Sequence, residues 1–184
     1  MGTDLLTRGV EEGWAGTPHP AVSVVIPCLN EARNIEECVV RARLVLAEHC
    51  VTGEIIVVDN GSTDGSGDIA RAAGAIVVEE PRRGYGSAYL AGLAAARGDV
   101  IVMADADLTY DFDDIPRFVA ELEGGADLVV GNRMRNIRPG AMPFLNRYVG
   151  NPALSGFLNL LYRTGVKDAH CGMRGVRRDG LDTL

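Results

Sequence analysis

The chain has 184 residues, of which 47% are hydrophobic and 23% are charged, as in an ordinary globular domain. Its net charge of −7 is uneven: residues 1–130 carry 9 basic and 22 acidic side chains, and residues 131–184 carry 9 basic and 3 acidic ones. The sequence has no run of 18 or more apolar residues, so no membrane-spanning helix is predicted. The four cysteines show no metal-site spacing, which favours reduced thiols in a cytosolic protein.

Residues 1–20 mix glycine, threonine, proline and charge without periodicity, and we expect a mobile N-terminal leader there. Beyond it, short runs rich in β-branched residues alternate with stretches of helical periodicity. The expected strands are residues 21–26, 54–58, 75–79, 100–103 and 127–130. Helices are expected between them, the first capped by Asn30 and the third spanning residues 87–97. This alternation with short turns predicts an α/β fold, a Rossmann-like and mostly parallel sheet with helices on both faces.

The regular alternation stops at Gly131. Residues 142–162 predict two short amphipathic helices, which could cover the sheet or rest on a membrane surface. Residues 171–176 are a candidate for one more strand. Because the chain stops at Leu184 where the pattern predicts the start of another helix, we expect residues 21–184 to be a catalytic domain truncated at its C-terminal end.

Carboxylates gather directly after the predicted strand 100–103, beginning with Asp105 and Asp107. Acidic groups at the carboxyl end of a buried strand repel one another unless a cation lies among them. In open α/β sheets ligands also bind at this end of the strands. The pair therefore predicts a Mg²⁺ or Mn²⁺ ion held by one or two carboxylates and completed by substrate phosphates. Capping of the next helix is the alternative role for acids here, and we assign it to Asp113 or Asp114.

Two glycine-rich turns resemble cofactor loops only superficially. The turn beginning at Gly84 has Tyr89 where a dinucleotide fingerprint needs its third glycine, and it follows the third predicted strand rather than the first. The turn from Gly61 to Gly65 lacks the Gly-Lys pair of a P-loop. Neither NAD binding nor an ATPase-type phosphate loop is therefore predicted.

Five short motifs, most of them at a strand end or a helix start, occur in one order along the chain. They are residues 27–31 (PCLNE), 57–64 (VVDNGSTD), 83–86 (RGYG), 105–107 (DAD) and 131–133 (GNR). Over residues 21–178 this order resembles the glycosyltransferase family 2 enzymes with the GT-A fold. The resemblance is greatest to the branch of polyprenyl-phosphate sugar synthases, such as dolichyl-phosphate mannose and glucose synthases.

The resemblance implies a nucleotide-sugar site in the first half of the chain. The residues that it places beside the nucleotide are Pro27, Asn30, Glu31, Asp59, Arg83 and Gly84, with Asp59 on the base. Asp105 and Asp107 would hold the Mg²⁺ or Mn²⁺ ion that bridges the donor diphosphate. The family often has two aspartates where this chain has Asp59-Asn60.

The resemblance also implies an acceptor site in the basic second half. Arg133 matches the family's Gly-Ser-Arg arginine and would act in catalysis and on the acceptor phosphate. Arg147 lies where such enzymes carry a second acceptor-phosphate arginine, although it could equally be an exposed helix residue. Residues 168–174 (DAHCGMR) resemble a further family segment, in which His170 could face the donor or be structural.

The reaction implied is inverting transfer of a hexose from a UDP-glucose or GDP-mannose type of donor to a polyprenyl phosphate, at the inner face of the cytoplasmic membrane. Peripheral membrane contact is expected and nucleic acid is not expected as a partner. Transfer to a sugar or protein hydroxyl is an alternative, for which Asp168 is the one candidate base. A non-catalytic nucleotide-sugar-binding module is another. A nucleotidyltransferase is disfavoured, because residues 27–31 lack its Gly-x-Gly-x-Arg loop.

Overall fold

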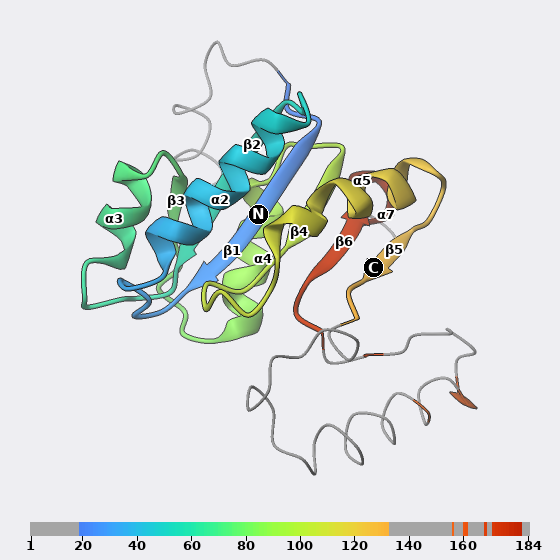
Figure 1. The fold of residues 1–184 in the computed structure, drawn as a ribbon. Helices are drawn as coiled ribbons and strands as arrows, with labels where there is room; N and C mark the ends of the chain where they lie inside the picture. Colours follow the sequence, from blue (N-terminus) through green and yellow to red (C-terminus); the bar gives the residue numbers. More distant parts are fainter. Residues whose placement is uncertain (1–18, 133–155, 157–159, 162–167, 169–170, 182–184) are drawn as a thin grey trace.

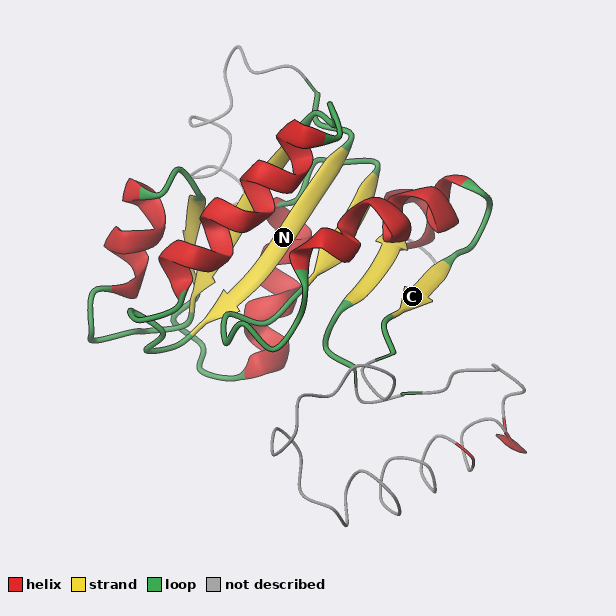
Figure 2. Ribbon diagram, in the orientation of Figure 1, coloured by secondary structure: helices red, strands yellow, loops and turns green. Residues whose placement is uncertain are grey.

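The computed structural model describes residues 19–132, 156, 160–161, 168 and 171–181 (Figure 1). Strands and helices alternate up to residue 130 (Figure 2). The strands are β1 (Val22–Cys28), β2 (Gly53–Asp59), β3 (Ile76–Glu79), β4 (Val100–Met103), β5 (Leu128–Val130) and β6 (Arg174–Arg177). The helices are α2 (Ile35–Glu48), α3 (Ser66–Ala72), α4 (Tyr85–Ala95), the 3-10 turn η1 (Phe112–Asp114), α5 (Ile115–Glu123) and α7 (Arg178–Leu181).

The sheet has the strand order β3-β2-β1-β4-β6-β5. β1 pairs in parallel with β2 and β4, β2 pairs in parallel with β3, and β6 runs antiparallel to both β4 and β5. The predicted mostly parallel sheet is thereby confirmed. The strand order reverses between β1 and β4, because the chain moves outward from β1 to β3 and then returns to the other side of β1. Such a switch point is where open α/β sheets bind ligands, at the carboxyl ends of the strands.

Helices cover both faces of this sheet, with α2 and α5 across the front and α4 behind in the view of Figure 1. Alternate residues of β1 supply the two layers of the core: Val24 packs with α2 and α5, and Val25 packs on the α4 side. The close approach of α4 depends on Gly92, where a Cβ atom would lie 2.4 Å from Cγ1 of Val25. The buried layers hold the carboxyl ends of β1, β2 and β4 in a fixed arrangement.

Helix starts differ from the prediction in three places. Asn30 does not cap α2, which begins at Ile35 after Asn34; Asn30 instead has a left-handed backbone (φ 58°) and belongs to the preceding turn. α4 begins at Tyr85, two residues before the expected start. Asp114 occupies the N-cap position of α5, as expected, but its side chain makes no capping hydrogen bond. Asp111 instead caps the preceding η1, where its carboxylate accepts from the Asp113 amide at 3.1 Å.

Several expectations fall on residues outside the described part of the chain. The expected leader is described only at His19 and Pro20, where His19 Nε2 lies 3.1 Å from Asp99 Oδ1. The amphipathic helices expected over residues 142–162 are described at three positions only. The additional strand is confirmed as β6, a few residues later than expected. Within the described residues, no helix has both the length and the apolar character needed to cross a bilayer.

Candidate active site

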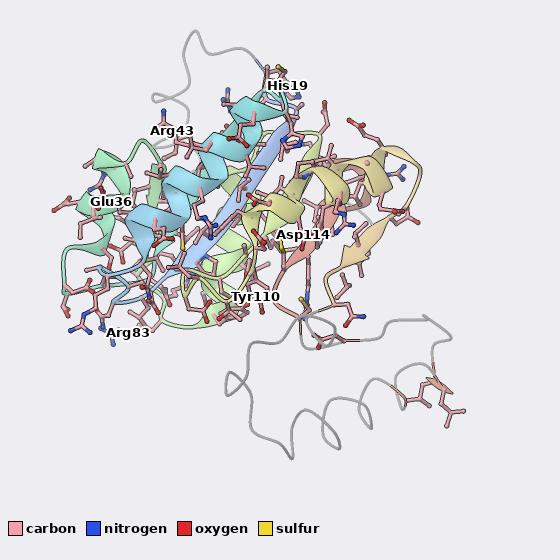
Figure 3. The ribbon with its side chains drawn as sticks, viewed as in Figure 1. His19, Glu36, Arg43, Arg83, Tyr110 and Asp114 are labelled. Carbon is pink, nitrogen blue, oxygen red and sulfur yellow. The ribbon has the colours of Figure 1, made fainter. Side chains whose placement is uncertain are left out.

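A hollow of about 290 Å³ opens at the carboxyl ends of β1, β2 and β4. Figure 3 shows Arg83 and Tyr110 at this end of the sheet and His19 at the opposite end. The loops after these three strands line the hollow, together with the first turn of α4. Its lining residues are Pro27, Cys28, Leu29, Glu31, Asn60, Gly84, Tyr85, Ala88, Asp105, Ala106 and Asp107. The switch point of the sheet is therefore also a concave surface with acidic groups.

The two central carboxylates follow β4 directly. The amide of Ala104 donates to the Val25 carbonyl at 3.1 Å, which extends the β1–β4 pairing to the edge of the hollow. Asp105 is half-buried, whereas Asp107 is exposed and accepts from the Thr109 amide at 2.9 Å. Leu108, which follows Asp107, has a left-handed backbone (φ 57°) that turns the chain sharply after Asp107. The strand end and this turn present both carboxylates to the same hollow.

Two tyrosines of α4 contact the Asp105 carboxylate. The Tyr85 hydroxyl donates to Oδ1 at 2.8 Å, and the Tyr89 hydroxyl lies 3.4 Å from the same oxygen. Partial loss of water around the hydroxyls raises the pKa of both above the usual range, even though the Tyr85 side chain as a whole is exposed, and the nearby negative charge of Asp105 contributes to the shift. Both side chains therefore remain protonated near pH 7 and can act as donors. The positive charge of Arg174 also acts on Tyr85, in the opposite direction.

The loops after β1 and β2 are bonded to each other beside the hollow. The Asn30 amide donates to Ser62 Oγ at 3.0 Å, and Asn30 Oδ1 accepts from the Thr63 amide at 2.9 Å. The Ser62 amide in turn donates to Asp59 Oδ1 at 2.8 Å. The Glu31 amide donates to Ser66 Oγ at 2.9 Å. These contacts join residues that are about thirty positions apart into one rigid rim.

Asn60 connects the end of β2 to the start of α4. Its side chain is buried, with Nδ2 donating to the carbonyls of Glu80 at 2.8 Å and Arg82 at 2.9 Å. Its Oδ1 accepts from the Gly84 amide at 2.7 Å. All the hydrogen-bonding positions of an asparagine amide except one lone pair are thus used. Asn60 thereby fixes the loop that precedes Tyr85.

The structure brings most of the predicted donor residues together. Pro27, Glu31, Gly84 and Asp105 line one hollow, together with Asp107, the second predicted metal ligand. The other three predicted donor residues, Asn30, Asp59 and Arg83, lie in the adjoining loops without lining it. Arg133 and Arg147 lie outside the described residues.

Sequence reasoning missed Asn60, Tyr85 and Tyr89 as site residues. The signal that could have found the tyrosines is their spacing of four residues at the start of a helix, which places them on one face. Nothing in the sequence shows which strand end that face meets.

The residues of the hollow fit a divalent cation held by few protein ligands. Asp105 and Asp107 are oxygen donors of the kind that Mg²⁺ and Mn²⁺ take. Across the described residues, no three His, Cys, Asp or Glu side chains converge in a way that could hold a metal ion. Mg²⁺ is commonly bound by one or two carboxylates together with substrate phosphates and water, and this site offers that donor set.

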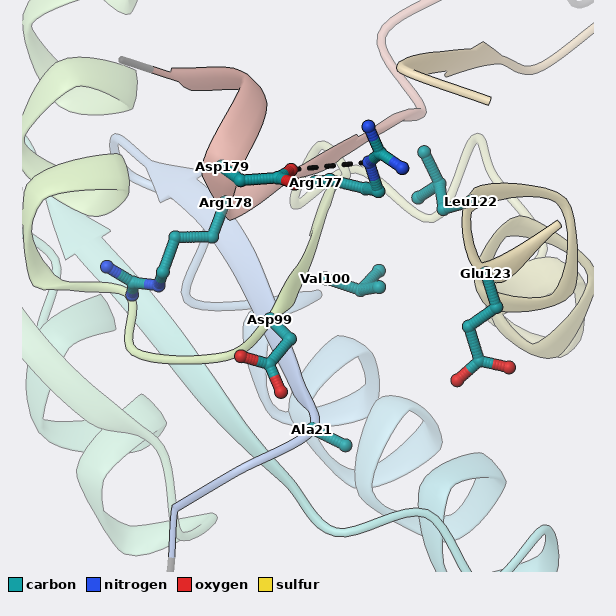
Figure 4. Close-up of a pocket in the computed structure, with 8 residues that line it drawn as sticks. All are labelled: Ala21, Asp99, Val100, Leu122, Glu123, Arg177, Arg178 and Asp179. Carbon is teal, nitrogen blue, oxygen red and sulfur yellow. Dashed lines mark ion pairs between the residues drawn. The ribbon is translucent and has the colours of Figure 1, made fainter. Parts of the chain in front are cut away.

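A second hollow, of about 610 Å³, lies at the other end of β4 (Figure 4). Its lining includes Asp99, Arg177, Arg178 and Asp179. Arg177 is paired with Asp127 at 2.8 Å and with Asp179 at 3.2 Å. This hollow has a larger volume than the first, but it lies away from the carboxyl ends of the parallel strands, and Arg177 in its lining is already paired with two carboxylates. We therefore place the chemistry at the hollow of Asp105.

Comparisons with known proteins identify the family of the chain. The sequence pattern of the family described as Glycosyl transferase family 2 matches residues 23–184. The chain is 45% identical over 167 residues to the low-salt glycan biosynthesis hexosyltransferase Agl6 of Haloferax volcanii. This match covers 90% of this chain and 40% of that protein. It is 40% identical over 133 residues to a dolichyl-phosphate hexose transferase of the same organism, covering 71% of this chain and 56% of that one.

A solved structure shows the same fold. Glucosyl-3-phosphoglycerate synthase from Mycobacterium tuberculosis, in complex with Mn²⁺, UDP and phosphoglyceric acid, superposes with a TM-score of 0.68 at 30% identity. The match covers 92% of this chain and 59% of that one, and it confirms the predicted GT-A fold. The chain spans 40, 56 and 59% of the lengths of these three proteins.

Proposed function

Because this chain belongs to glycosyltransferase family 2, we propose that it transfers a hexose from a nucleoside diphosphate sugar to a polyprenyl phosphate. The observation that carries the proposal is the meeting of Asp105 and Asp107 with the loops after β1 and β2 around one hollow. The relatives named hexosyltransferase and dolichyl-phosphate hexose transferase support the same reaction class.

The donor would lie across the switch point of the sheet. In this proposal the rim built by Asn30, Asp59 and Ser62 receives the nucleoside, and Glu31 and Gly84 flank it inside the hollow. Asp105 and Asp107 face the place where the diphosphate would lie. A nucleotide of the uridine type is supported by the solved structure, which holds UDP with Mn²⁺. UDP-glucose and GDP-mannose are the donors to compare first.

The reaction would be a displacement at the anomeric carbon with the nucleoside diphosphate as leaving group. Asp105 and Asp107 would hold a Mg²⁺ or Mn²⁺ ion, which when bound neutralises the negative charge that builds on the leaving diphosphate. The rim residues orient the donor, so that the anomeric carbon is presented to an acceptor entering from the open side of the hollow. The protein's own part in this scheme is positioning and charge placement.

A polyprenyl phosphate would need orientation rather than deprotonation, because it is already an anion near pH 7. Arginine suits this task, since one guanidinium can bind two phosphate oxygens. Arg133 and Arg147 are the proposed acceptor ligands, and they belong to the segment 131–184 with its 9 basic and 3 acidic side chains. Action on a lipid phosphate would require peripheral contact with the membrane, which we propose for its cytoplasmic face.

A hydroxyl acceptor is the second candidate, and the solved synthase with bound phosphoglyceric acid favours it. Such an acceptor needs a carboxylate base within hydrogen-bond reach of the hydroxyl. Asp168 is the candidate, and its side chain is buried at 1% exposure. A buried carboxylate would have to open to solvent or substrate to act in this way, and we therefore rank the phosphate acceptor first.

The direct test is a transfer assay with labelled UDP-glucose or GDP-mannose, Mn²⁺ and two competing acceptors, a short-chain prenyl phosphate and 3-phosphoglycerate. The proposal predicts labelled prenyl phosphate sugar, and loss of that product in Asp107→Asn. Label on 3-phosphoglycerate alone would favour the hydroxyl acceptor. Donor binding without any transfer would identify a binding module and contradict the proposed activity.

A further inference from the structure

Tyr85 and Tyr89 of α4 contact the Asp105 carboxylate but have no part in the proposed reaction. We propose that Tyr85 and Tyr89 are positioning residues that fix the orientation of Asp105 for metal-dependent binding of the donor. This inference rests on the proposed function. It adds to that function two side chains which would touch the carboxylate rather than the reacting atoms.

The first step is the direction of the hydrogen bonds. A tyrosine hydroxyl has one proton, and the 2.8 Å contact with Asp105 Oδ1 uses that of Tyr85, since an ionised carboxylate can only accept. The hydroxyl oxygens of Tyr85 and Tyr89 lie 3.3 Å apart, so Tyr89 donates to Tyr85 or, more weakly, to Asp105 at 3.4 Å. The result is a short chain of donors that ends on one carboxylate oxygen.

The second step is the support that Tyr89 gives to Tyr85. Tyr85 is 59% exposed, and an exposed tyrosine would normally sample several rotamers. Its ring packs edge-on against that of Tyr89, with centroids 4.7 Å apart and an interplanar angle of 76°. Aromatic pairs in this arrangement contribute about 0.5–1.5 kcal/mol beyond the area that they bury. Tyr89 therefore holds the hydroxyl of Tyr85 on the carboxylate.

The third step is the opposite side of the carboxylate. A Cβ atom on Gly172 would lie 2.3 Å from Asp105 Oδ2, so the backbone before β6 passes directly against this oxygen. The Gly172 amide donates to the Tyr110 hydroxyl at 2.7 Å, which holds that backbone in place. Asp105 is thus bounded by tyrosine hydroxyls at Oδ1 and by the Gly172 backbone at Oδ2. Little freedom remains for rotation of its side chain.

The fourth step is the anchoring of α4 itself. Gly84, which precedes Tyr85, donates its amide to the buried Asn60 side chain at 2.7 Å. Asn60 follows β2, and Asp105 follows β4, so the tyrosines connect two strand ends through the start of one helix. Groups that orient a metal ligand from rigid elements typically change metal affinity or activity by about 10–100-fold when they are removed.

A positioning role predicts effects that a purely structural role would not. The Tyr85 hydroxyl is at an exposed residue, and its removal deletes no buried apolar surface, so folding stability should change little. Affinity for the metal–nucleotide complex should fall, because the carboxylate regains the freedom to turn away from the cation. Affinity for the nucleotide without metal should be retained.

The experiment compares the wild-type protein with Tyr85→Phe, Tyr89→Phe and a control, Leu90→Ala. Leu90 follows Tyr89 on α4 and is 67% exposed, so its substitution changes the same helix without touching Asp105. Binding of UDP is measured by calorimetry with and without Mn²⁺. We expect Tyr85→Phe to weaken Mn²⁺-dependent binding by about 10–100-fold, Tyr89→Phe to weaken it less, and the control to match the wild type.

Wild-type affinity of Tyr85→Phe for UDP with Mn²⁺ would overturn the inference. An equal loss with and without Mn²⁺ would also overturn it, because it would place Tyr85 on the nucleotide itself. Failure of the wild-type protein to bind UDP with Mn²⁺ would instead count against the proposed function. Crystal structures without metal then decide the positioning role: Asp105 should change its side-chain orientation in Tyr85→Phe, and an unchanged orientation would contradict it.

Discussion

Replacing Gly172 by alanine should disturb the site through a single added methyl group. The new Cβ would lie 2.3 Å from Asp105 Oδ2 and 2.7 Å from the Tyr110 hydroxyl oxygen. Real Cβ atoms essentially never approach another heavy atom closer than 3.0 Å, so one of these groups must move. Tyr110 is only 7% exposed and cannot withdraw easily. The Asp105 carboxylate is therefore the group that yields, and it must move by about 0.7 Å to lengthen this contact from 2.3 Å to 3.0 Å.

The expected cost has two parts. Overpacking of this kind lowers the free energy of unfolding by about 1–3 kcal/mol. Turning the carboxylate also weakens its hydrogen bond with Tyr85, and disturbance of a metal ligand's support costs about 10–100-fold in affinity. We expect Gly172→Ala to remain folded, with a lower urea midpoint, and to bind UDP with Mn²⁺ about 10–100-fold more weakly than the wild type.

Calorimetry of UDP with Mn²⁺ and urea unfolding followed by circular dichroism measure the two parts separately. Gly180→Ala is the matched control, because an added Cβ there would meet no atom within 4 Å. Its UDP affinity should equal that of the wild type. If Gly172→Ala bound UDP with Mn²⁺ as tightly as the wild type, the described packing of Gly172 against Asp105 would be wrong.

Three further predictions concern the surroundings of the site. Asn60→Asp should lower the free energy of unfolding by about 2–4 kcal/mol, because a carboxylate would face the carbonyls of Glu80 and Arg82. Protonation of that carboxylate should bring the urea midpoints of variant and wild type together as the pH is lowered, and a difference in midpoint that stays constant with pH would contradict this. Arg82 lowers the pKa of Glu80 from 4.5 to about 2, so Glu80 stabilises the fold above pH 4.5 and this contribution is lost as the pH falls toward 2. Glu80→Gln should therefore make the free energy of unfolding fall less steeply between these pH values, and an unchanged fall would show that the ion pair contributes nothing. Cys50 is exposed, whereas burial raises the pKa of Cys38 to about 11, so in native protein at pH 8 a thiol reagent should modify Cys50 rapidly and Cys38 only after denaturation, as mass spectrometry of the peptides can establish.

The sheet could be predicted from the sequence because its strands are short β-branched runs that recur with helical stretches between them. Val24 and Val25 belong to one such run, and the structure buries them on opposite faces. The sequence predicts β6 only approximately, since residues 174–177 contain glycine and arginines and lack a clear strand pattern. The antiparallel pairing of β6 with β4 depends on contacts between residues more than seventy positions apart.

The acidic part of the site could also be predicted, because Asp105 and Asp107 follow a buried strand at a spacing that suits a cation. The roles of Tyr85 and Asn60 could not. A tyrosine near a glycine-rich turn is compatible with many environments, and only the position of α4 behind β1 and β2 brings its hydroxyl to the end of β4. Asn60 departs from the family pattern in the sequence, but its contacts with the loop before α4 are visible only in the fold.

The most direct test of the account is calorimetric titration of the protein with UDP-glucose, GDP-mannose and UDP-N-acetylglucosamine, each with and without Mn²⁺, beside Asp107→Asn. We predict that one donor binds and that its affinity depends on Mn²⁺ in the wild type and loses that dependence in the variant. Donor binding that is the same with and without Mn²⁺, or that is unaffected in Asp107→Asn, would contradict the assignment of the metal and donor site to the ends of β1, β2 and β4.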